Sequence, residues 1–498
     1  MNIKKFIISS SARWFDLFTT AIFSIIAVPI MLSKWSVETY AAWILLMGIT
    51  TYVNMPTKGL NTYIFSKNLQ LGKTKKKEIS KNITSSLPIT IFITLVTIFF
   101  LTIEFKYELI TNNLNIAETI KKEFILALLL FAVSSLITFS ISPFYTQALS
   151  IFGYLPLFTW SGSVRIFIGY LLLISGIYFY NTSFLISFII LTTSNIFFHL
   201  GEYIIIFFVL KKEKIKYEPI NIKQGVNDFL KSIWISLTNI TETIGTHGMR
   251  IIILTLASPM TLVMFATIRT ITNMFMQLLD TIRSPLLIVI MESISEKDKK
   301  KININFKLYY LFISIIVYPL LIIFHFFVED VYKIWTLGNI KFNLETYSIL
   351  VVAVLVACIN FPYRIIISGN NLIKRQFLII SIKSLFLIIF IYSFYEDFKI
   401  LSFSIAILLS ELIELLFNYL VIESFFKKIK FSYDKHLLSG VLINLIISSS
   451  IFVNYFLNDS YINDSMVFIM ICVLLYLLNI ILMLKNSKIL IKRVMQNN

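Results

Sequence analysis

The chain has 498 residues, of which 57% are hydrophobic and 14% charged, and its formal net charge is +17. A soluble protein of this length would divide into several cores with polar surfaces between them, and about a quarter of its residues would be charged. The composition therefore excludes an ordinary soluble enzyme and indicates a membrane protein. Such a basic balance would suggest nucleic acid in a soluble protein, but the lysines lie in short runs between apolar stretches, so we expect no nucleic-acid partner.

The cysteines and the N-terminal segment exclude two further classes of protein. Cys358 and Cys472 both lie inside apolar runs, so they can build neither a disulfide framework nor a zinc cluster, and we predict no metal site and no cofactor. Lys4 and Lys5 precede an apolar stretch as they would in a signal peptide, but no small-x-small cleavage site follows. We therefore expect an uncleaved first membrane span.

Apolar runs of membrane-spanning length follow one another along the whole chain. A helix needs about 20 apolar residues to cross the hydrocarbon core of a bilayer, because backbone groups left unpaired in lipid cost several kcal/mol each. The runs predict an all-α polytopic membrane protein with about fourteen spans. They cover residues 14–33, 40–64, 83–103, 123–147, 155–177, 184–210, 230–257, 260–291, 308–328, 345–367, 377–395, 400–424, 437–457 and 465–484.

The basic residues between the runs predict the orientation of these spans. If the N-terminus is cytoplasmic, most basic residues outside the spans fall on the cytoplasmic side, including the runs Lys75–Lys77, Lys211–Lys212 and Lys299–Lys301. This distribution obeys the positive-inside rule, so we expect a bacterial inner-membrane protein with both termini in the cytoplasm. The exception is the turn at residues 148–157, which would be cytoplasmic but contains no basic residue. An error of two spans is open at that point.

Spacing along the chain predicts two related halves and an extra pair of helices. A span that ends near Ser33 and the lysines that follow the next span recur near Ser258, at an offset of roughly 220 to 226 residues. A parallel repeat of this kind usually forms two bundles related by a pseudo-twofold axis, with a substrate site between them. The predicted parts are a six-helix bundle at 1–228, a second at 229–436, and two further spans with a cytoplasmic tail at 437–498.

Four predicted spans, the first, second, seventh and eighth, carry polar residues at steps of three and four, which keep side chains on one helix face. A charge at the bilayer centre costs about 2.5–3.5 kcal/mol even on insertion scales, so such residues normally face protein or a water-filled cavity. We expect the four stripes to line one central cavity; the competing interpretation is that they hold neighbouring helices together. The stripes comprise Arg13, Asp16, Thr20 and Ser24; Thr50, Asn54, Lys58 and Asn61; Asn239, Glu242, Thr246 and Arg250; and Arg269, Asn273, Gln277, Asp280 and Ser284.

Other ionisable residues inside the predicted spans receive no specific role. His247 lies one turn before Arg250, where a core hydrogen bond is favoured over a proton relay. The other histidines, His199, His325 and His436, have no metal-ligand spacing around them. The remaining charged residues inside spans are Arg165, Arg283, Arg364, Lys383, Glu202, Glu411 and Glu414.

Two segments at the start of the chain resemble a known family. The stretch Ser11-Ala12-Arg13-Trp14-Phe15-Asp16 and the later Glu38-Thr39-Tyr40-Ala41-Ala42-Trp43 are similar to the opening of the O-antigen or repeat-unit flippases. These proteins belong to the polysaccharide biosynthesis family in the multidrug, oligosaccharidyl-lipid and polysaccharide exporter superfamily. That family often has glycine before the tyrosine, where this chain has Thr39. The span number, the repeat and the trailing helix pair agree with the resemblance.

The resemblance implies a flippase, not an enzyme, that carries an undecaprenyl-pyrophosphate-linked oligosaccharide to the outer leaflet for a surface polysaccharide such as the O-antigen of lipopolysaccharide. A cationic cavity would stabilise the pyrophosphate. We expect Arg13, Lys58, Arg250 and Arg269 to contact this headgroup, and Asp16, Glu242 or Asp280 to balance charge and exchange a coupling H⁺ or Na⁺ as in an antiporter. Membrane lipid and polysaccharide-assembly proteins are the other expected partners.

Three alternatives stay open from sequence alone. A multidrug exporter of the same superfamily also has a central cavity, although it typically has twelve spans and acidic sites for cationic drugs. A peptidoglycan-precursor flippase has the same fold and span number. The enzymatic alternative is a membrane sugar polymerase or ligase, which would usually carry one large periplasmic loop; the longest predicted periplasmic segments, 104–122 and 329–344, are short.

Overall fold

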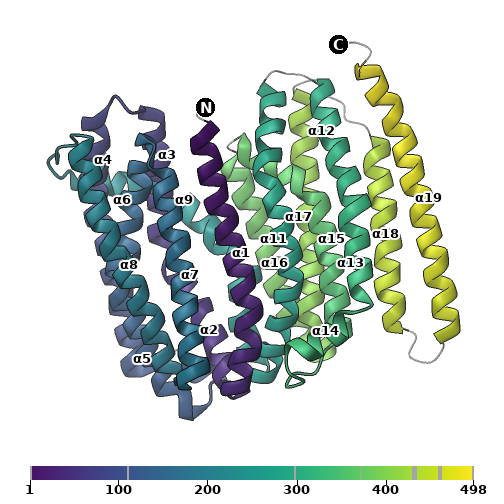
Figure 1. Ribbon diagram of the computed structural model, residues 1–498, viewed down its shortest axis with the longest axis horizontal. Helices are drawn as coiled ribbons and strands as arrows, with labels where there is room; N and C mark the ends of the chain where they lie inside the picture. The colour runs from purple at the N-terminus through teal and green to yellow at the C-terminus, as the bar shows by residue number, and fades with distance from the viewer. Residues whose placement is uncertain are drawn as a thin grey trace. The chain divides into compact units, whose positions relative to one another are not determined.

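The computed structural model describes residues 3–108, 111–295, 299–370, 372–428, 435–457 and 462–495, and all regular structure within them is helical (Figure 1). The prediction of an all-α polytopic membrane fold is confirmed. Within these described ranges, ten helices are long and apolar enough to cross a membrane, and the shorter segments Val37–Val53 and Leu438–Phe452 are also apolar.

Every predicted run coincides with one helix or with helices that follow one another directly. The first half contains α1 (Ile3–Lys34), α2 (Val37–Val53), α3 (Met55–Leu71), α4 (Lys76–Tyr107), α5 (Glu118–Ser135), η2 (Leu136–Ile141), α6 (Ser142–Leu149), η3 (Ser150–Phe152), α7 (Leu155–Tyr180) and α8 (Phe184–Lys212). Then come α9 (Ile222–Thr243), η4 (Ile244–Gly248), α10 (Met249–Leu256), α11 (Pro259–Ser295), α12 (Lys299–Phe312), η5 (Ile313–Val317), α13 (Tyr318–His325), α14 (Val328–Trp335), α15 (Leu344–Gly369), α16 (Ile373–Phe398), α17 (Leu401–Lys428), α18 (Lys435–Leu457) and α19 (Ile462–Met495).

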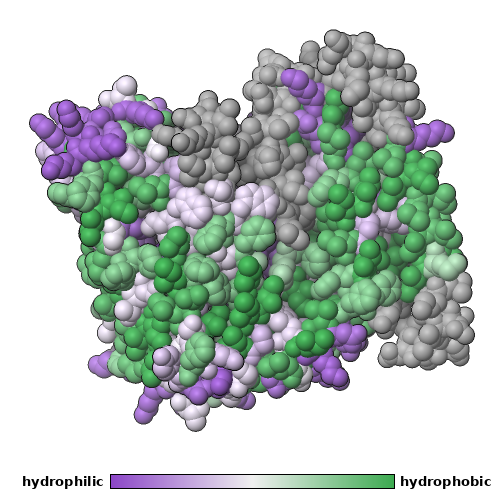
Figure 2. All heavy atoms as spheres, viewed as in Figure 1, coloured by the Kyte–Doolittle hydropathy of each residue, from purple (hydrophilic) through white to green (hydrophobic). Residues whose placement is uncertain are grey.

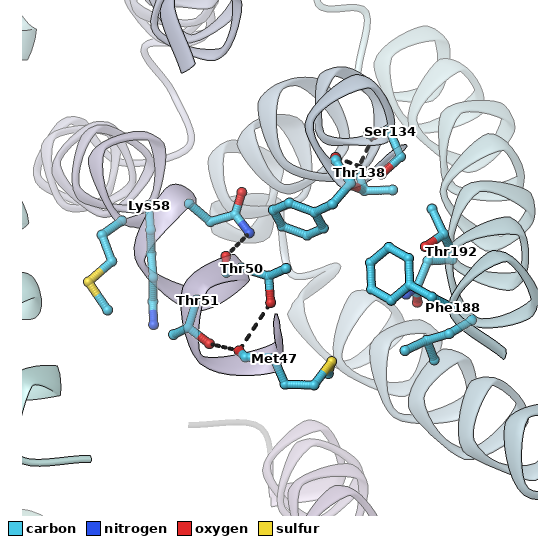
Figure 3. A pocket seen from close by; sticks show the side chains of 13 residues that line it. Met47, Thr50, Thr51, Lys58, Ser134, Thr138, Phe188 and Thr192 are labelled. Atoms are coloured by element: carbon cyan, nitrogen blue, oxygen red, sulfur yellow. Dashed lines mark hydrogen bonds between the residues drawn. The ribbon is translucent and has the colours of Figure 1, made fainter. Parts of the chain in front are cut away.

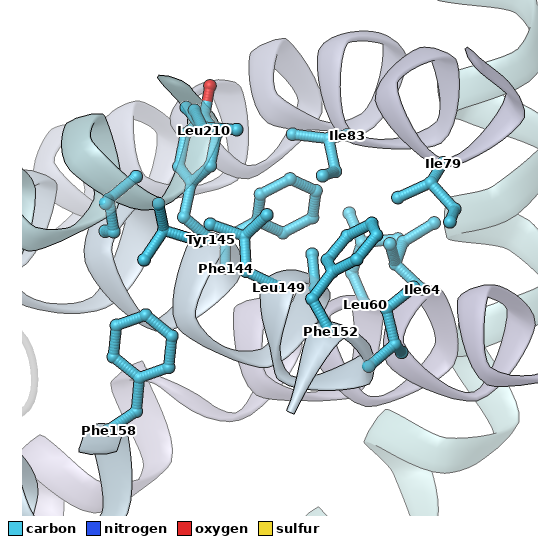
Figure 4. Close-up of a cluster of buried hydrophobic side chains, with 14 residues drawn as sticks. Leu60, Ile64, Ile79, Ile83, Phe144, Tyr145, Leu149, Phe152, Phe158 and Leu210 are labelled. Atoms are coloured by element: carbon cyan, nitrogen blue, oxygen red, sulfur yellow. The ribbon is translucent and has the colours of Figure 1, made fainter. Parts of the chain in front are cut away.

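The chain forms two compact units, each with its own packed interior. Unit 1 comprises residues 1–266 and 335–339, and unit 2 comprises residues 267–334 and 340–498. The interior of unit 1 includes an apolar cluster where α3, α4, α6, η3, α7 and α8 meet (Figure 4), with Leu60, Ile83, Phe144 and Leu149 almost fully buried. The three-part division predicted from the repeat stays a prediction.

Close helix packing in unit 1 depends on a small residue. The α3 helix packs along α9, and a Cβ atom at Gly59 would overlap the side chain of Ser236. In this position glycine allows the two backbones to approach closely, as small residues do between membrane helices. The contact fixes α3, which carries Lys58, against α9.

The middle of the helices is covered by apolar side chains, whereas hydrophilic ones gather at the ends (Figure 2). Large residues such as Phe92, Phe99, Phe197 and Phe208 are each more than 60% exposed. In water such a surface would drive aggregation, whereas in a bilayer it contacts lipid tails. The surface therefore agrees with the span assignment.

The turn at residues 148–157, which has no basic residue of its own, lies against basic segments. Tyr154 donates a hydrogen bond from its hydroxyl to Glu213 at 3.0 Å, and Lys76 donates to the Glu213 backbone oxygen at 2.6 Å. Lys76 also lies over the ring of Phe152, and Lys212 over that of Tyr154. The turn therefore lies at the same end of unit 1 as the lysine-rich segments before α4 and after α8, so the span count through this region needs no correction.

Unit 2 is built around α15. Most of its side chains are buried, and hydroxyl groups on neighbouring helices donate to its backbone oxygens, Tyr309 to Cys358 at 2.8 Å and Tyr318 to Leu355 at 3.0 Å. The α16, α17 and α18 helices pack against it. The α15 helix also carries Arg364, which contacts Glu411 and Glu414 on α17.

Candidate functional site

A cavity of about 290 Å³ lies within unit 1, between α2, α3, α5, η2 and α8 (Figure 3). Its wall combines hydroxyl and amide groups with two phenyl rings, and Lys58 is the one charged side chain among the lining residues that the structure describes. The lining residues are Met47, Thr50, Thr51, Asn54, Met55, Lys58, Phe131, Ser134, Thr138, Phe188, Leu191, Thr192 and Asn195. Such a wall suits a ligand that carries both hydroxyl groups and negative charge.

The cavity borders the break in the second predicted span. The α2 helix ends at Val53, Asn54 lies between the helices, and Pro56 occupies the first turn of α3, a position where its missing N–H is not needed. The Asn54 amide group donates to the Thr50 backbone oxygen at 3.0 Å, which leaves its own carbonyl oxygen as an acceptor at the wall. The sequence therefore predicted one span where the structure has two helices end to end.

The threonine hydroxyls of this wall are also acceptors. Thr50 and Thr51 both donate to the Met47 backbone oxygen, at 3.0 and 2.9 Å, so their oxygen lone pairs remain available to a ligand (Figure 3). Lys58, by contrast, supplies only donors. The α2–α3 wall thus offers several oxygens that can accept hydrogen bonds from the hydroxyl groups of a ligand, beside one cation.

Unlike Arg364 and Lys383, Lys58 has no carboxylate within ion-pair distance among the described residues. Its side chain is exposed, and it reaches the cavity from the start of α3. Of the residues predicted on this stripe, Thr50, Asn54 and Lys58 line the cavity, whereas Asn61 is buried and is not part of its lining.

The stripe predicted on the seventh span passes through a π-helical turn, η4, which changes its helical phase. Such turns shift the face on which later residues lie. Arg250 follows the turn; it donates to the Ile44 backbone oxygen at 3.3 Å and packs over Gly48, both on α2. Asn239 lies half-buried before the turn, whereas Glu242 and Thr246 are exposed. The four residues therefore do not form one uninterrupted face.

The α1 stripe is described in part. Asp16 and Thr20 are half-buried, and Asp16 interacts electrostatically with Arg165 and Tyr170 on α7. The side chain of Arg13 lies outside the described part of the chain. This helix packs along α7, so Asp16 lies near a basic partner that sequence spacing did not connect to it.

The α11 stripe belongs to unit 2. Arg269, Asn273 and Gln277 are half-buried on consecutive turns. The side chain of Asp280 lies outside the described part of the structure. Convergence of all four stripes on one central cavity stays a prediction.

The sequence analysis missed a hydrogen-bonded chain in unit 1 that joins α7 to α8. The Nη1 atom of Arg165 lies 2.6 Å from Nε2 of His199, and Nδ1 of His199 lies 2.8 Å from Oε2 of Glu202. Ser161 donates to the other Glu202 oxygen at 2.9 Å. The signal was present as Ser161 and Arg165 four residues apart and His199 and Glu202 three apart, because such spacings place each pair on one helix face.

Unit 2 holds a second buried cluster, formed by two cations and two carboxylates. Arg364 on α15 donates from Nη2 to Glu411 at 2.9 Å and from Nη2 and Nε to Glu414 at 2.5 Å. Lys383 on α16 donates to the same two carboxylates of α17, at 2.5 and 2.7 Å. The charges balance, so this cluster leaves no cation for an anionic ligand.

Comparison with solved structures shows which fold this is. A lipid II flippase MurJ in an inward closed conformation is 19% identical over 98% of this chain and 100% of that chain, with a TM-score of 0.62. An outward-facing multidrug resistance MATE transporter is 13% identical over 86% of this chain and 97% of its own, with a TM-score of 0.59. A MOP superfamily transporter from Pyrococcus furiosus, described by a reverse polarity of its binding pocket, is 14% identical over 86% and 97%, with a TM-score of 0.60.

No family model and no curated protein matches the sequence. The likeness at these identities is one of fold: the chain has the helical membrane fold of MOP superfamily transporters. The flippase structure covers 98% of this chain, whereas each of the two transporters covers 86%.

Proposed function

We propose that this protein is a flippase that moves an undecaprenyl-pyrophosphate-linked oligosaccharide from the cytoplasmic to the periplasmic leaflet by alternating access. The observation that carries the proposal is the cavity of unit 1, in which Lys58 is the one charged residue among the described lining residues and is surrounded by hydroxyl and amide groups. A pyrophosphate supplies the anion and a sugar supplies the hydroxyl groups.

The electrostatics of the cavity favour an anionic ligand. A lysine inside a span normally pairs with an acidic group or faces a wet cavity, and Lys58 lines a cavity without a described carboxylate partner. The oxygens of Thr50, Thr51 and Asn54 accept hydrogen bonds from a sugar, and the rings of Phe131 and Phe188 offer apolar surface to its C–H face.

Arg250 would extend the anion site. Its guanidinium donates to a single described oxygen, the carbonyl of Ile44, so most of its donors are available to a phosphate. We propose that Arg13, Lys58, Arg250 and Arg269 contact the headgroup in turn as the cavity changes its access, with Asp16, Glu242 and Asp280 balancing charge. The proposed membrane is the bacterial inner membrane, with both termini in the cytoplasm as the lysine runs predict.

The length of the structural match and the cavity lining support a flippase within this fold. The flippase structure matches 98% of the chain, whereas the multidrug transporters match 86%. A multidrug exporter for cationic drugs would need acidic residues at its site, and the described cavity lining has none. A peptidoglycan-precursor flippase is the second candidate, because the matched structure bears the name lipid II flippase. It would use the same cationic site.

The test uses the purified protein in proteoliposomes that contain undecaprenyl-pyrophosphate-linked N-acetylglucosamine. A soluble galactosyltransferase tags the sugar that reaches the outer leaflet. Lys58→Ala should slow tagging about 10- to 100-fold, since a hydrogen bond to a charged group contributes about 1.5–3 kcal/mol. Lys58→Arg should keep the rate within a few-fold.

Lys73→Ala is the matched control, because Lys73 is an exposed loop lysine remote from the cavity lining. Unchanged tagging by Lys58→Ala would remove the cavity from the transport path. Export of a cationic dye with no movement of the lipid-linked sugar would replace the proposal by the multidrug alternative.

A further inference from the structure

The hydrogen-bonded side chains of Arg165, His199 and Glu202 allow only one assignment of their protons. A guanidinium has donors and no acceptor, so Nε2 of His199, 2.6 Å from Arg165, must accept. The ring then carries its proton on Nδ1, which donates to Glu202 at 2.8 Å. Glu202 is an ionised acceptor, since it also receives the hydroxyl proton of Ser161. His199 is therefore held neutral between one cation and one anion.

A proton that binds at Nε2 of His199 would break this arrangement. The new N–H would point at the donors of Arg165, so two cationic donors would face each other at the distance of a short hydrogen bond. The ring would keep its bond to Glu202, which becomes an ion pair. Arg165 would therefore have to leave, while His199 stays.

Asp16 on α1 is placed to receive the displaced arginine. It already interacts electrostatically with Arg165. The Nε atom of Arg165 is buried and donates to no acceptor among the described residues, so the side chain is only partly bound in its present position. Movement toward Asp16 would satisfy this donor.

The other charged groups on the helices around His199 lie at their ends or beyond Tyr170. The helices α5, η2 and α6 pack against α8, and residues 124–152 contain no Asp, Glu, Lys, Arg or His. The charged residues of α5, which are Glu118, Lys121, Lys122 and Glu123, lie at its N-terminal end, where Glu123 accepts a hydrogen bond from the Leu185 N–H at the start of α8. Arg250 interacts electrostatically with Tyr170 of α7. Arg165 is the one charged residue of α7, and Lys211 and Lys212 lie at the far end of α8. The remaining titratable side chains around the chain are the phenols Tyr145, Tyr170 and Tyr203.

The histidine is connected to the cavity through its own helix. Thr192 and Asn195 of α8 line the cavity, and His199 follows Asn195 by four residues, one turn along the same face. A change in how α8 is tied to α7 and, through Arg165, to α1 therefore acts on a wall of the cavity.

We propose that His199 is the binding site of the coupling proton, and that its protonation transfers Arg165 from His199 on α8 to Asp16 on α1. The step takes up one proton at Nε2 and moves no electrons; the proton leaves when Arg165 returns. The coupling part of this proposal rests on the proposed transport function, whereas the proton-binding part does not.

Proton binding is measured first, on the substrate-free full chain in nanodiscs with a pH-indicating dye in weak buffer. After a jump from about pH 8 to about pH 5, a range in which histidine titrates, His199→Gln should take up one proton per molecule fewer than the wild type. Glutamine is chosen because its amide can donate to Glu202 and accept from Arg165, as the neutral ring does. Equal uptake by both proteins would overturn the proposal.

Coupling is measured in the proteoliposome assay with an imposed pH gradient. The wild type should move the lipid-linked N-acetylglucosamine several-fold faster with the gradient than without it. His199→Gln should lose this stimulation and keep its basal rate. Arg165→Gln and Asp16→Asn should also lose it. Arg165→Gln should keep normal proton uptake, because it removes the transfer and not the binding site; Arg165→Lys should restore part of the stimulation.

His325→Gln is the control for a buried histidine, since His325 in unit 2 packs against the rings of Tyr347 and Phe452. It should keep the full stimulation. Stimulation that survives in His199→Gln would overturn the proposal while leaving the flippase function intact. A wild type that takes up the proton but moves no lipid-linked sugar would instead reject the proposed function and leave the proton site standing.

Discussion

Each unit carries a buried cluster of charged residues, and the two clusters differ in what a proton can do to them. In unit 2, Arg364 and Lys383 each contact both Glu411 and Glu414, so every charge has two partners of opposite sign. In unit 1, His199 lies between Arg165 and Glu202, and one of its two hydrogen bonds depends on a neutral ring. The first arrangement ties three helices together, whereas a proton that binds the ring in the second would break one of its hydrogen bonds.

The largest loss of stability is expected when one member of the unit 2 cluster is removed. Arg364→Met should destabilise the protein by about 3–5 kcal/mol, because it leaves an uncompensated buried carboxylate. Thermal unfolding in detergent, followed by the loss of monodisperse protein, measures this effect. A destabilisation under about 1 kcal/mol would mean that the cluster is solvated and not a lock.

Removing a whole ion pair from the unit 2 cluster should lower the stability of the protein much less. Lys383→Met combined with Glu411→Leu keeps the cluster neutral, and replacement of a buried ion pair by apolar residues is often neutral or stabilising. We expect a stability within about 1.5 kcal/mol of the wild type and an unchanged rate of flipping in the proteoliposome assay. Loss of transport by a stable double variant would contradict the view that this cluster is static.

In unit 1, Glu202→Gln should have an intermediate effect. The amide oxygen can still accept from Ser161 or His199, so the expected loss is about 1–3 kcal/mol, that of a charged hydrogen-bond acceptor. The variant distinguishes the two clusters, since its loss of stability should be smaller than that of Arg364→Met. An equal or larger loss would show that the unit 1 chain is as rigid as the unit 2 cluster.

The smallest effect is expected at an exposed pair, Lys399 with Glu396, beside the α16–α17 turn. The hydrogen bond with Glu396 raises the pKa of Lys399 above its usual value. A raised pKa stabilises the folded state below the unfolded pKa of lysine, and this contribution disappears only as the pH rises through the folded pKa. Glu396→Gln should therefore leave the melting temperature unchanged between about pH 6 and pH 8. A clear shift of the melting temperature would show that exposed ion pairs contribute as much to stability as the buried clusters do.

Helical spacing grouped Thr50, Asn54 and Lys58, because residues three and four apart share a face of a helix, and all three line the cavity of unit 1. That the four stripes line one central cavity stays a prediction. The same rule placed Glu242 and Arg250 on one stripe, but η4 inserts a π turn between them. Such a turn depends on packing around η4 and α2, which periodicity alone does not report.

Spacing along the sequence could not identify the partners of the charged side chains. Arg165 and His199 are 34 positions apart, and Arg364 and Glu414 are 50. Spacing on one helix says which residues share a face, but it does not say which face of the next helix they meet. For this reason His199 received no role from the sequence, although it is the centre of the unit 1 chain.

The amino-acid sequence by itself determined the class of this protein, its helical spans and their order, because water and lipid sort residues by hydrophobicity and each span must pair its own backbone groups. Tertiary structure alone decided which cations are paired with carboxylates and which line a cavity. Arg364 and Lys58 look alike as basic residues in apolar runs, but the packing of α15 to α17 pairs the first with two carboxylates and leaves the second at a cavity. The energy of a charge in a membrane depends on its neighbours within a few ångströms, and only the packed helices bring those neighbours together.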